Sequence, residues 1–333
     1  MLFASPCRNN LRNCDFINVP LCTIVILTYK GKQHLALLLP TIREAIACYD
    51  RKGSIEVLIV DNGSDEQTRN YVQGHFPEFN YVFSPVNDYL FSLNGFIREL
   101  ESEYMLMLND DMKLERNILN ELIPAIQKNG SLFAVACRIM DFEGNYTVSA
   151  VRKARYSRGW LYNYYLDPAE SVAKYTLYPG GGAAIFRTAY FNALGGFDDL
   201  YRPAYCEDTD LGIRAWQHGW GTVYDPAAVL YHREGGTIND QFRKDKLEQT
   251  IFKNQLLCMV KNTHIPGFLP WFYLMLPYRI LRSFFTNRNL FMAWKLAVKQ
   301  LPDALARRKR TKHAANDLSW IQLLDKPYLE GNH

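Results

Sequence analysis

The stretch YMLMLNDDM, residues 104–112, decides the fold of this 333-residue chain. Five consecutive apolar residues end there in three polar ones, Asn109, Asp110 and Asp111. An uninterrupted apolar run of this length is typical of a strand buried on both faces of a sheet. A helical pattern over 114–127 follows. The two aspartates are therefore expected at the carboxyl end of a buried strand, where ligands bind in open α/β sheets.

Adjacent carboxylates repel each other, so Asp110 and Asp111 need a partner at this position. A divalent cation is the simplest partner, because hard cations prefer carboxylate oxygens. The alternative is that one of the two aspartates caps the following helix. Capping accounts for one carboxylate and not for both, so the pattern favours a metal site.

Three further segments indicate strands of the same sheet. They are CTIVILT at 22–28, IEVLIVD at 55–61 and the short YVF at 81–83. Helical patterns separate them. One runs to about Tyr49 and is interrupted or restarted at Pro40, and FSLNGFIREL at 91–100 leads into the opening strand. This alternation of strands and helices predicts parallel βαβ units.

Right-handed crossovers place the carboxyl ends of parallel strands along one edge of the sheet. We therefore expect four strand-end residues to line a single crevice: Thr28, Asp61, Asp110 and Asp111. The expected fold is an α/β structure with a mostly parallel, Rossmann-like sheet flanked by helices.

The middle of the chain is less regular. LFAVACRIM at 132–140 indicates another strand, whereas 141–178 reads as irregular and aromatic-rich. PGGGAAIFR at 179–187 places three glycines before an apolar strand, where the backbone can approach a ligand closely; a tight turn is the alternative. Residues 221–232 indicate one or two strands, and 240–262 a long helix.

The composition is that of an ordinary globular protein, with 48% hydrophobic and 22% charged residues. The net charge of +4 does not by itself indicate nucleic acid binding. Seven cysteines cannot all pair within the chain, and none forms a Cys-x-x-Cys motif, which favours a reducing compartment. The first residues do not resemble a signal peptide, and no uninterrupted membrane-spanning segment is expected.

The segment YCEDTDLGIRAWQHG, 205–219, predicts a helix with three acids at its start, Glu207, Asp208 and Asp210. Acids favour helix N-termini, and Asp210 is placed to pair with Arg214 one turn later. The functional alternative is that one of these carboxylates faces the crevice as a general base. His232 is likewise either a satisfied structural histidine or a further ligand in a site that already holds carboxylates.

The tail from 266 to 312 combines apolar and basic residues. Its first part, 266–285, is strongly apolar but contains Pro270 and Pro277, and a basic run occupies 307–312. The segment either packs on the main domain or forms interfacial helices whose basic side chains face anionic lipid headgroups. We predict membrane association through 266–312. No nucleic-acid-reading motif accompanies the basic run, so nucleic acid is not a predicted partner.

Seven segments in chain order resemble the motifs of family 2 glycosyltransferases with the A-type (GT-A) fold. They are TIVILTYKG, VLIVDNGSDE, LMLNDDM, PGGGAAIFR, LGGFDD, EDTDLGIRAWQHGW and VLYHREGGT. The set is most similar to the bacterial rhamnosyltransferase-like branch. The resemblance covers roughly residues 20–262. It implies a lead-in at 1–20, a GT-A glycosyltransferase domain at 21–262 and a C-terminal amphipathic and basic helical region at 263–333.

The resemblance implies donor-binding roles, position by position. Thr28 and Tyr29 would touch the nucleotide, Asp61 would contact its base or ribose, and Asp110 would lie near the ribose. Asn94 falls in the donor-binding set, although the usual run of small residues before this asparagine is missing. Gly181 and Gly182 would form the loop that borders the donor sugar and the acceptor.

The resemblance also implies the metal and the base. Asp111 and His232 would bind Mn²⁺ or Mg²⁺ at the donor diphosphate, where the metal acts as a Lewis acid. Asp208 would remove the proton from an acceptor hydroxyl, with Glu207 beside it in support. The site is incomplete without a nucleotide diphosphate, so metal binding to the free protein is expected to be weak.

The resulting prediction is an inverting, metal-dependent glycosyltransferase that uses a nucleotide-diphosphate sugar, with rhamnose as the donor sugar that the resemblance favours. The expected acceptor is a glycan, lipid-linked, in cell-surface polysaccharide synthesis. The expected location is cytoplasmic, peripheral at the inner face of the cell membrane. The alternatives are a nucleotidyltransferase and a non-catalytic, membrane-associated protein that binds nucleotides or glycans.

Overall fold

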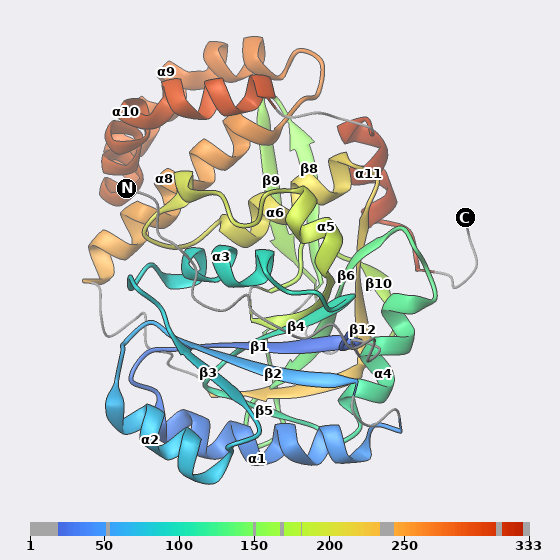
Figure 1. The fold of residues 1–333 in the computed structure, drawn as a ribbon. Coiled ribbons are helices and arrows are strands. Elements are labelled where there is room, and N and C mark those ends of the chain that lie inside the picture. Colours follow the sequence, from blue (N-terminus) through green and yellow to red (C-terminus); the bar gives the residue numbers. More distant parts are fainter. Residues whose placement is uncertain are drawn as a thin grey trace, which may run out of the picture.

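A computed structural model describes residues 19–50, 54–148, 151–166, 170–180, 182–233, 243–310 and 315–328. In these ranges ten strands form one sheet and two form a separate hairpin (Figure 1). The sheet consists of β1 (Cys22–Thr28), β2 (Ile55–Asp61), β3 (Asn80–Phe83), β4 (Tyr104–Asn109), β5 (Met112–Leu114), β6 (Leu132–Met140), β7 (Tyr146–Val148), β10 (Lys174–Tyr175), β11 (Ala183–Arg187) and β12 (Gly221–His232). The hairpin consists of β8 (Arg152–Ser157) and β9 (Trp160–Tyr165).

The helices of the sheet domain are α1 (Lys32–Cys48), α2 (Glu66–His75), α3 (Leu93–Arg98), α4 (Ile118–Gln127), α5 (Thr188–Ala193) and α6 (Glu207–Gln217), with 3₁₀ turns η1 (Tyr89–Ser92) and η2 (Asp199–Tyr201). The later helices are α8 (Lys244–Asn262), α9 (Phe268–Thr286), α10 (Arg288–Arg310) and α11 (Asp317–Leu324).

The first half of the sheet is parallel and has the predicted edge. Strands β3, β2, β1 and β4 lie side by side in that order, all parallel. Thr28 pairs in register with Asp61, and Leu27 with Asn109. The ends of β1, β2 and β4 therefore meet at one edge, which positions the candidate site.

The second half makes the sheet mixed rather than mostly parallel. Strand β11 lies between β4 and β6 and runs antiparallel to both. Strand β12 is a single strand with a register shift between Asp225 and Val229, and it pairs parallel with β6. The same strand continues past the shift to pair antiparallel with β5.

Each face of the sheet has its own core. Ile24 and Leu106 join side chains of α1, α2 and α4, whereas their neighbours Val25 and Met105 join those of α3, α5, α6 and α8. Successive strand residues point to opposite faces, so a continuous apolar run is what a doubly covered strand requires. Figure 1 shows α1 and α2 on one side of β1 and β2, and α3 on the other.

Three local predictions need correction. Helix α1 is continuous through Pro40, because Leu38, Leu39 and Ile42 on both sides of it are buried in one core. A short strand, β5, precedes α4, so the helix begins at Ile118. The segment 141–178 is not irregular throughout, since it contains β7, the β8–β9 hairpin and β10.

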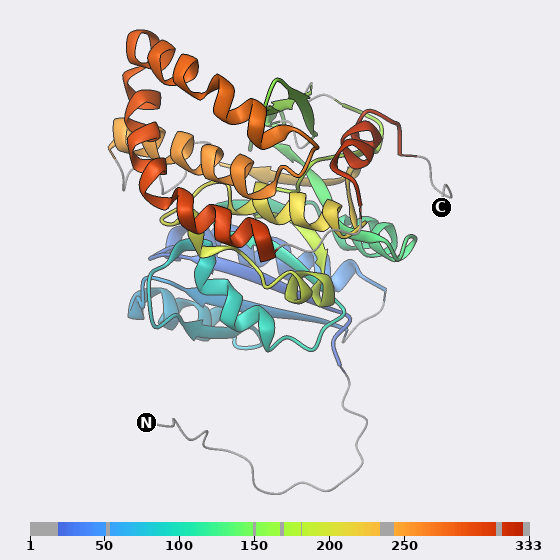
Figure 2. The ribbon, with the colours of Figure 1, turned by 90° about the horizontal axis from the view of Figure 1, so that it is seen from above.

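The C-terminal helices pack on the sheet domain with one side only. Phe268, Trp294 and Trp320 belong to the same core cluster as Val25 of β1. Figure 2 shows α8, α9 and α10 grouped to one side of the sheet, with α9 at the outer edge of the group. Within the described ranges, none of the helices combines the length and the apolar character needed to cross a membrane.

Candidate active site

The carboxyl ends of β1 and β4 meet at Asp110. The Thr28 hydroxyl donates to Oδ2 of Asp110 at 2.5 Å, and Nδ1 of His34 lies 3.3 Å from Oδ1. A Cβ on Gly31 would lie 2.1 Å from Oδ2, so only glycine lets the backbone pass this close. The structure thus brings Thr28 and Asp110 together as predicted and adds His34. Contact of these groups with a nucleotide stays a prediction.

Asp111 and His232, far apart in the sequence, are neighbours in space. Strand β5 pairs with the end of β12, with Met112 opposite His232. As a result, Nε2 of His232 lies 3.3 Å from Oδ2 of Asp111. The other carboxylate oxygen, Oδ1, is buried and has no hydrogen-bond partner. A buried oxygen of this kind is costly to leave unsatisfied, and a bound cation would satisfy it.

The donor set suits a divalent cation but is small. A carboxylate oxygen and an imidazole nitrogen are ligands that Mn²⁺ accepts. In the part of the chain that the structure describes, no group of three or more His, Cys, Asp or Glu side chains is arranged to hold a metal ion. Asp111 and His232 would therefore leave several coordination positions to a ligand.

Asp61 accepts three hydrogen bonds from within the protein. Its Oδ1 accepts the backbone N–H of Gly63 at 2.7 Å, and its Oδ2 accepts the N–H of Asp65 at 2.9 Å and the hydroxyl of Tyr81 at 2.6 Å. The side chain is fully buried. These hydrogen bonds shape the loop after β2, and contact of Asp61 with a base or ribose stays a prediction.

Asn94 is also engaged inside the protein. Its amide donates to the carbonyl of Phe197 at 2.8 Å and accepts the N–H of Phe197 at 2.9 Å, which ties α3 to the LGGFDD loop. A role for Asn94 in donor binding stays a prediction. Gly182 lies against the β4 end, where a Cβ would come within 2.3 Å of Asn109 Oδ1. Tyr29 is half-buried at the end of β1, and Gly181 lies outside the described residues.

The loop before α6 is held in an unusual conformation. Tyr205 and Cys206 have φ values of 71° and 73°, in the left-handed region that L residues rarely adopt. The buried amide of Asn254 in α8 donates to the carbonyls of Tyr201, Ala204 and Tyr205 at 2.6, 2.8 and 2.9 Å. This brace from α8 fixes the start of α6, and with it Glu207 and Asp208.

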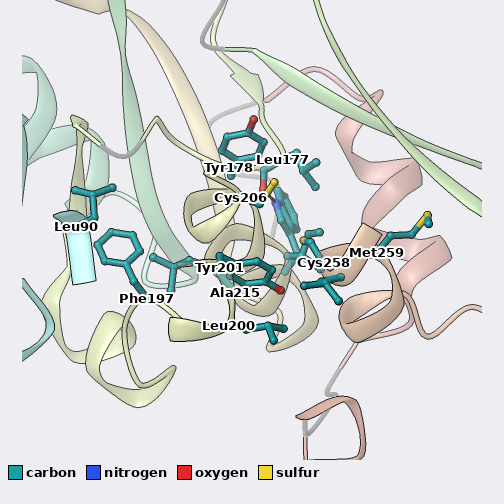
Figure 3. Packing of buried hydrophobic residues seen from close by; sticks show 14 of the residues in the cluster. Leu90, Leu177, Tyr178, Phe197, Leu200, Tyr201, Cys206, Ala215, Cys258 and Met259 are labelled. Atoms are coloured by element: carbon teal, nitrogen blue, oxygen red, sulfur yellow. Dashed lines mark hydrogen bonds between the residues drawn. The ribbon is translucent and has the colours of Figure 1, made fainter. Parts of the chain in front are cut away.

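Helix α6 is enclosed by its neighbours. Figure 3 shows Cys206 and Ala215 between Tyr178 on one side and Cys258 of α8 on the other. A Cβ on Gly212 would lie 2.4 Å from the Cβ of Tyr178. The loop after β10, which contains Tyr178, therefore packs directly on the backbone of α6. Of the three acids in the first turn of α6, Asp208 is the one that is partly exposed.

Asp210 links α6 to neighbouring segments through buried hydrogen bonds. It is fully buried and accepts hydrogen bonds from Arg214 (2.6 Å), Lys261 (2.6 Å), Asn262 (2.7 Å) and Tyr201 (2.7 Å). Burial alone would raise the pKa of Asp210, but Arg214 and Lys261 bring that pKa well below its ordinary value. Asp210 is therefore a structural carboxylate, as the pairing alternative predicted.

Glu207 and Asp208 occupy different electrostatic environments. Burial, reinforced by the charge of Asp208, raises the pKa of Glu207 to about 8. Burial also raises the pKa of Asp208, but Arg152 and hydrogen bonds from Thr209 oppose that rise. Asp208 is partly exposed, and its Oδ1 accepts the N–H of Thr209 at 2.6 Å. The rise in pKa is therefore unopposed by a positive charge at Glu207, whereas Arg152 favours the ionised form of Asp208.

Tyr89, which the sequence did not single out, lies between the two groups of carboxylates. Burial raises the pKa of its phenol, and the charges of Glu207, Asp208 and Asp111 raise it further. One phenol thus feels both the candidate base and the candidate metal ligand. Its φ of 50° is strained for a non-glycine residue, and its carbonyl accepts a hydrogen bond from Asn62 at 3.1 Å. Strain of this kind clusters at functional sites.

Arg152 is the second residue that the sequence missed. Its guanidinium lies 4.4 Å from the ring centroid of Tyr178 and 5.1 Å from that of Tyr165. The residue is only 8% exposed, and Nε and Nη1 have no hydrogen-bond partner. The hairpin that carries Arg152 lacks the regular alternation that marks a strand in sequence, so no signal pointed to it.

Comparisons with known proteins agree with the family that the sequence motifs resemble. The family model described as Glycosyl transferase family 2 matches residues 23–195. An N-acetylglucosaminyl-diphospho-decaprenol L-rhamnosyltransferase of Mycobacterium tuberculosis is 25% identical over 244 residues, which cover 65% of this chain and 78% of that protein. Rhamnosyltransferase WbbL of Escherichia coli is 25% identical over 192 residues, covering 53% of this chain and 72% of that protein.

Among solved structures, GalNAc-T7 with UDP, GalNAc and Mn²⁺ has a TM-score of 0.58 at 13% identity. The likeness covers 92% of this chain and 61% of that chain, and it concerns the fold alone. The predicted GT-A-type fold and family are thereby confirmed. The family model spans more than half of the sequence and includes Thr28, Asp110 and Asp111. This chain therefore belongs to glycosyl transferase family 2 and is a glycosyltransferase.

Proposed function

We propose that the protein transfers a sugar, with inversion, from a nucleotide-diphosphate sugar to a hydroxyl of a lipid-linked glycan acceptor, and that it depends on Mn²⁺ or Mg²⁺. Both named relatives are rhamnosyltransferases, and one name specifies a diphospho-decaprenol acceptor. These names support deoxythymidine-diphosphate rhamnose as the first donor to test. Family membership sets aside the nucleotidyltransferase and the non-catalytic binding protein.

The observation that carries the proposal is the pair formed by Asp111 and His232. A buried carboxylate oxygen without a donor lies beside an imidazole 3.3 Å away, at the sheet edge where ligands bind. The GalNAc-T7 structure, of similar fold, contains both Mn²⁺ and a nucleotide. When bound here, a divalent cation would neutralise charge on the leaving diphosphate. Two protein ligands would leave room for diphosphate oxygens.

Asp208 supplies the other half of the chemistry. Its carboxylate accepts the proton of the acceptor hydroxyl while the hydroxyl oxygen bonds to the anomeric carbon and the bond to the diphosphate breaks. One displacement of this kind inverts the anomeric configuration. Burial raises the pKa of Glu207 to about 8, whereas the charge of Arg152 and hydrogen bonds from Thr209 oppose the rise in the pKa of Asp208, which favours Asp208 as the base.

We expect Asp111→Asn to abolish metal-dependent nucleotide binding. Deoxythymidine diphosphate with Mn²⁺ should raise the melting temperature of the wild type by more than either one alone, because each completes the binding site of the other. The variant should lose this synergy, and Asp50→Asn, a change at an exposed aspartate after α1, should keep it. A wild type that no nucleoside diphosphate stabilises in the presence of Mn²⁺ or Mg²⁺ would refute the proposed function.

We also propose that α9 lies on an anionic membrane surface at the cytoplasmic face. Its large exposed side chains recur at helical spacing along one face: Trp271, Leu274, Tyr278, Leu281 and Phe285. Leu274 and Phe285 are 68% and 75% exposed. Between 264 and 302 the chain has five Lys and Arg residues and no Asp or Glu. An apolar stripe flanked by positive charge suits anionic lipid headgroups.

Replacing Leu274, Leu281 and Phe285 with serine should reduce sedimentation with phosphatidylglycerol-containing liposomes at least tenfold. Each buried methylene group contributes roughly 0.8 kcal/mol to membrane binding. Truncation near Pro266 would be a poor test, because it removes the core side chain of Phe268. Serine at the exposed Leu37 and Leu318 is the matched control. Equal sedimentation of the triple variant and the control would refute the membrane face.

A further inference from the structure

The β8–β9 hairpin connects the outer helix α9 with the candidate base. Its tip is fixed on α9: Arg279 donates to the carbonyls of Arg158 (2.7 Å) and Gly159 (3.2 Å), and its guanidinium lies 4.7 Å from the ring centroid of Trp160. Figure 1 shows the two strands running from the level of α9 and α10 towards α6. Six residues of strand span about 20 Å.

The inner end of the hairpin reaches the first turn of α6. Arg152 and Tyr165 pair across the two strands, and Nδ2 of Asn163 lies 3.4 Å from the Tyr178 hydroxyl. Tyr178 in turn packs on Gly212 of α6. Arg152 is close enough for its charge to act on Asp208. The hairpin therefore forms a wall of the crevice on the side of the base.

The side chains of this wall suit a phosphorylated sugar. Residues 151–166 include four basic residues, five aromatic residues and no acidic ones. Arg152 is more than nine-tenths buried, yet two of its N–H groups have no acceptor. A buried guanidinium with free donors is costly unless it meets an anion, and its fork geometry matches a phosphate. Exposed tyrosines on β9 offer stacking surfaces for a sugar ring.

We propose that the β8–β9 hairpin is the acceptor-binding wall and that Arg152 binds a phosphate of a lipid-linked sugar diphosphate, beside Asp208. The lipid would lie along α9, the diphosphate at Arg152 and the sugar hydroxyl at Asp208. This inference rests on the proposed function and assigns the acceptor class to residues that have no counterpart in the family motifs. The donor diphosphate belongs to the other side of the crevice, at Asp111 and His232.

The test compares two acceptors of the same sugar, N-acetylglucosaminyl diphosphate on a short polyprenyl chain and octyl N-acetylglucosaminide. The wild type should prefer the diphosphate acceptor at least tenfold in kcat/KM, as expected for charge-assisted hydrogen bonds to a phosphate. Arg152→Gln should remove this preference by raising KM for the diphosphate acceptor, with the octyl glycoside unchanged within twofold. Because Arg152 lowers the pKa of Asp208, both acceptors are assayed at the same pH, and the ratio of the two kcat/KM values cancels any effect of the substitution on the base.

Two controls separate this inference from the proposed function and from misfolding. Arg155→Gln, on the opposite face of the same strand and exposed, should keep the preference. Donor hydrolysis and the nucleotide-induced rise in melting temperature should be unchanged in Arg152→Gln, and Arg152→Lys should restore part of the preference.

Three results would overturn the acceptor assignment. The wild type could transfer equally well to both acceptors, Arg152→Gln could keep the preference, or Arg152→Gln could weaken donor binding as much as acceptor use. The first two would leave the proposed function intact, and the third would move Arg152 to the donor side. Absence of metal-dependent nucleotide binding in the wild type would overturn both proposals.

Discussion

Asp208→Asn should lower the rate of sugar transfer by roughly 100- to 10,000-fold, the range typical for loss of a general base. The asparagine keeps the size of the side chain and can still accept the Thr209 N–H, but it cannot take a proton from the acceptor. The variant should melt near the wild-type temperature and still bind nucleotide with Mn²⁺. Initial rates at saturating donor, with binding followed by thermal shift, measure both effects.

The pH dependence of the wild type provides an independent check on Asp208. A base must be ionised to act, and burial raises the pKa of Asp208 above the ordinary value of about 3.9. Transfer should therefore fall as pH decreases, with a midpoint above that value. Asp245→Asn, at an exposed aspartate in the first turn of α8, is the matched control for the substitution. Near-normal transfer by Asp208→Asn would show that another group is the base.

Asp210→Asn should destabilise the fold by roughly 3–5 kcal/mol, the effect of removing one partner from a buried ion pair. The change leaves Arg214 and Lys261 buried without the carboxylate that both contact at 2.6 Å. Denaturant unfolding of the variant and wild type measures the difference. Asp303→Asn breaks an exposed pair with Arg307 in α10 and should change stability by less than about 1 kcal/mol.

Acid should affect the stability of the wild type and of Asp210→Asn differently. Because the folded-state pKa of Asp210 lies below its unfolded value, its stabilisation is present above the unfolded pKa of about 3.9 and is lost as pH falls through the folded pKa. The wild type should therefore lose stability below about pH 4 more steeply than Asp210→Asn. Parallel acid profiles for the two proteins would mean that Asp210 does not carry this ion-pair network.

The sequence predicted the parallel half of the fold because its signals are local. Runs such as 22–28 and 104–108 are apolar without interruption and end in polar residues, and strand ends in a parallel sheet share one edge. The hairpin at 152–165 gave no such signal. Arg158 and Gly159 form its two-residue turn with positive φ at both positions, but arginine is not a residue that marks such turns in sequence.

The site divides in the same way. Asp110 and Asp111 follow the end of one strand and His232 ends another. The predicted topology and the order of the motifs were therefore enough to place them in one site. His34, Tyr89 and Arg152 come from a helix, a strained turn and an unrecognised strand, and nothing in their sequence neighbourhood fixes their distance from the crevice. The internal hydrogen bonds of Asp61 and Asn94 could not be foreseen from the sequence either. Their positions are as expected, but the donors that occupy their side chains, such as Tyr81 and the Phe197 N–H, come from other segments.

The hydrogen bonds from Asn254 let α8 determine where Asp208 lies relative to the membrane face. The loop that presents Asp208 is held by this helix rather than by the sheet, and the same three-helix group carries the proposed membrane face on α9. With α9 on the bilayer, the contacts between α8 and this loop set the height of Asp208 above the lipid. An acceptor whose sugar lies at that height above its lipid would place its hydroxyl at Asp208. An acceptor with a longer or shorter spacer between lipid and sugar would place the hydroxyl elsewhere and react more slowly.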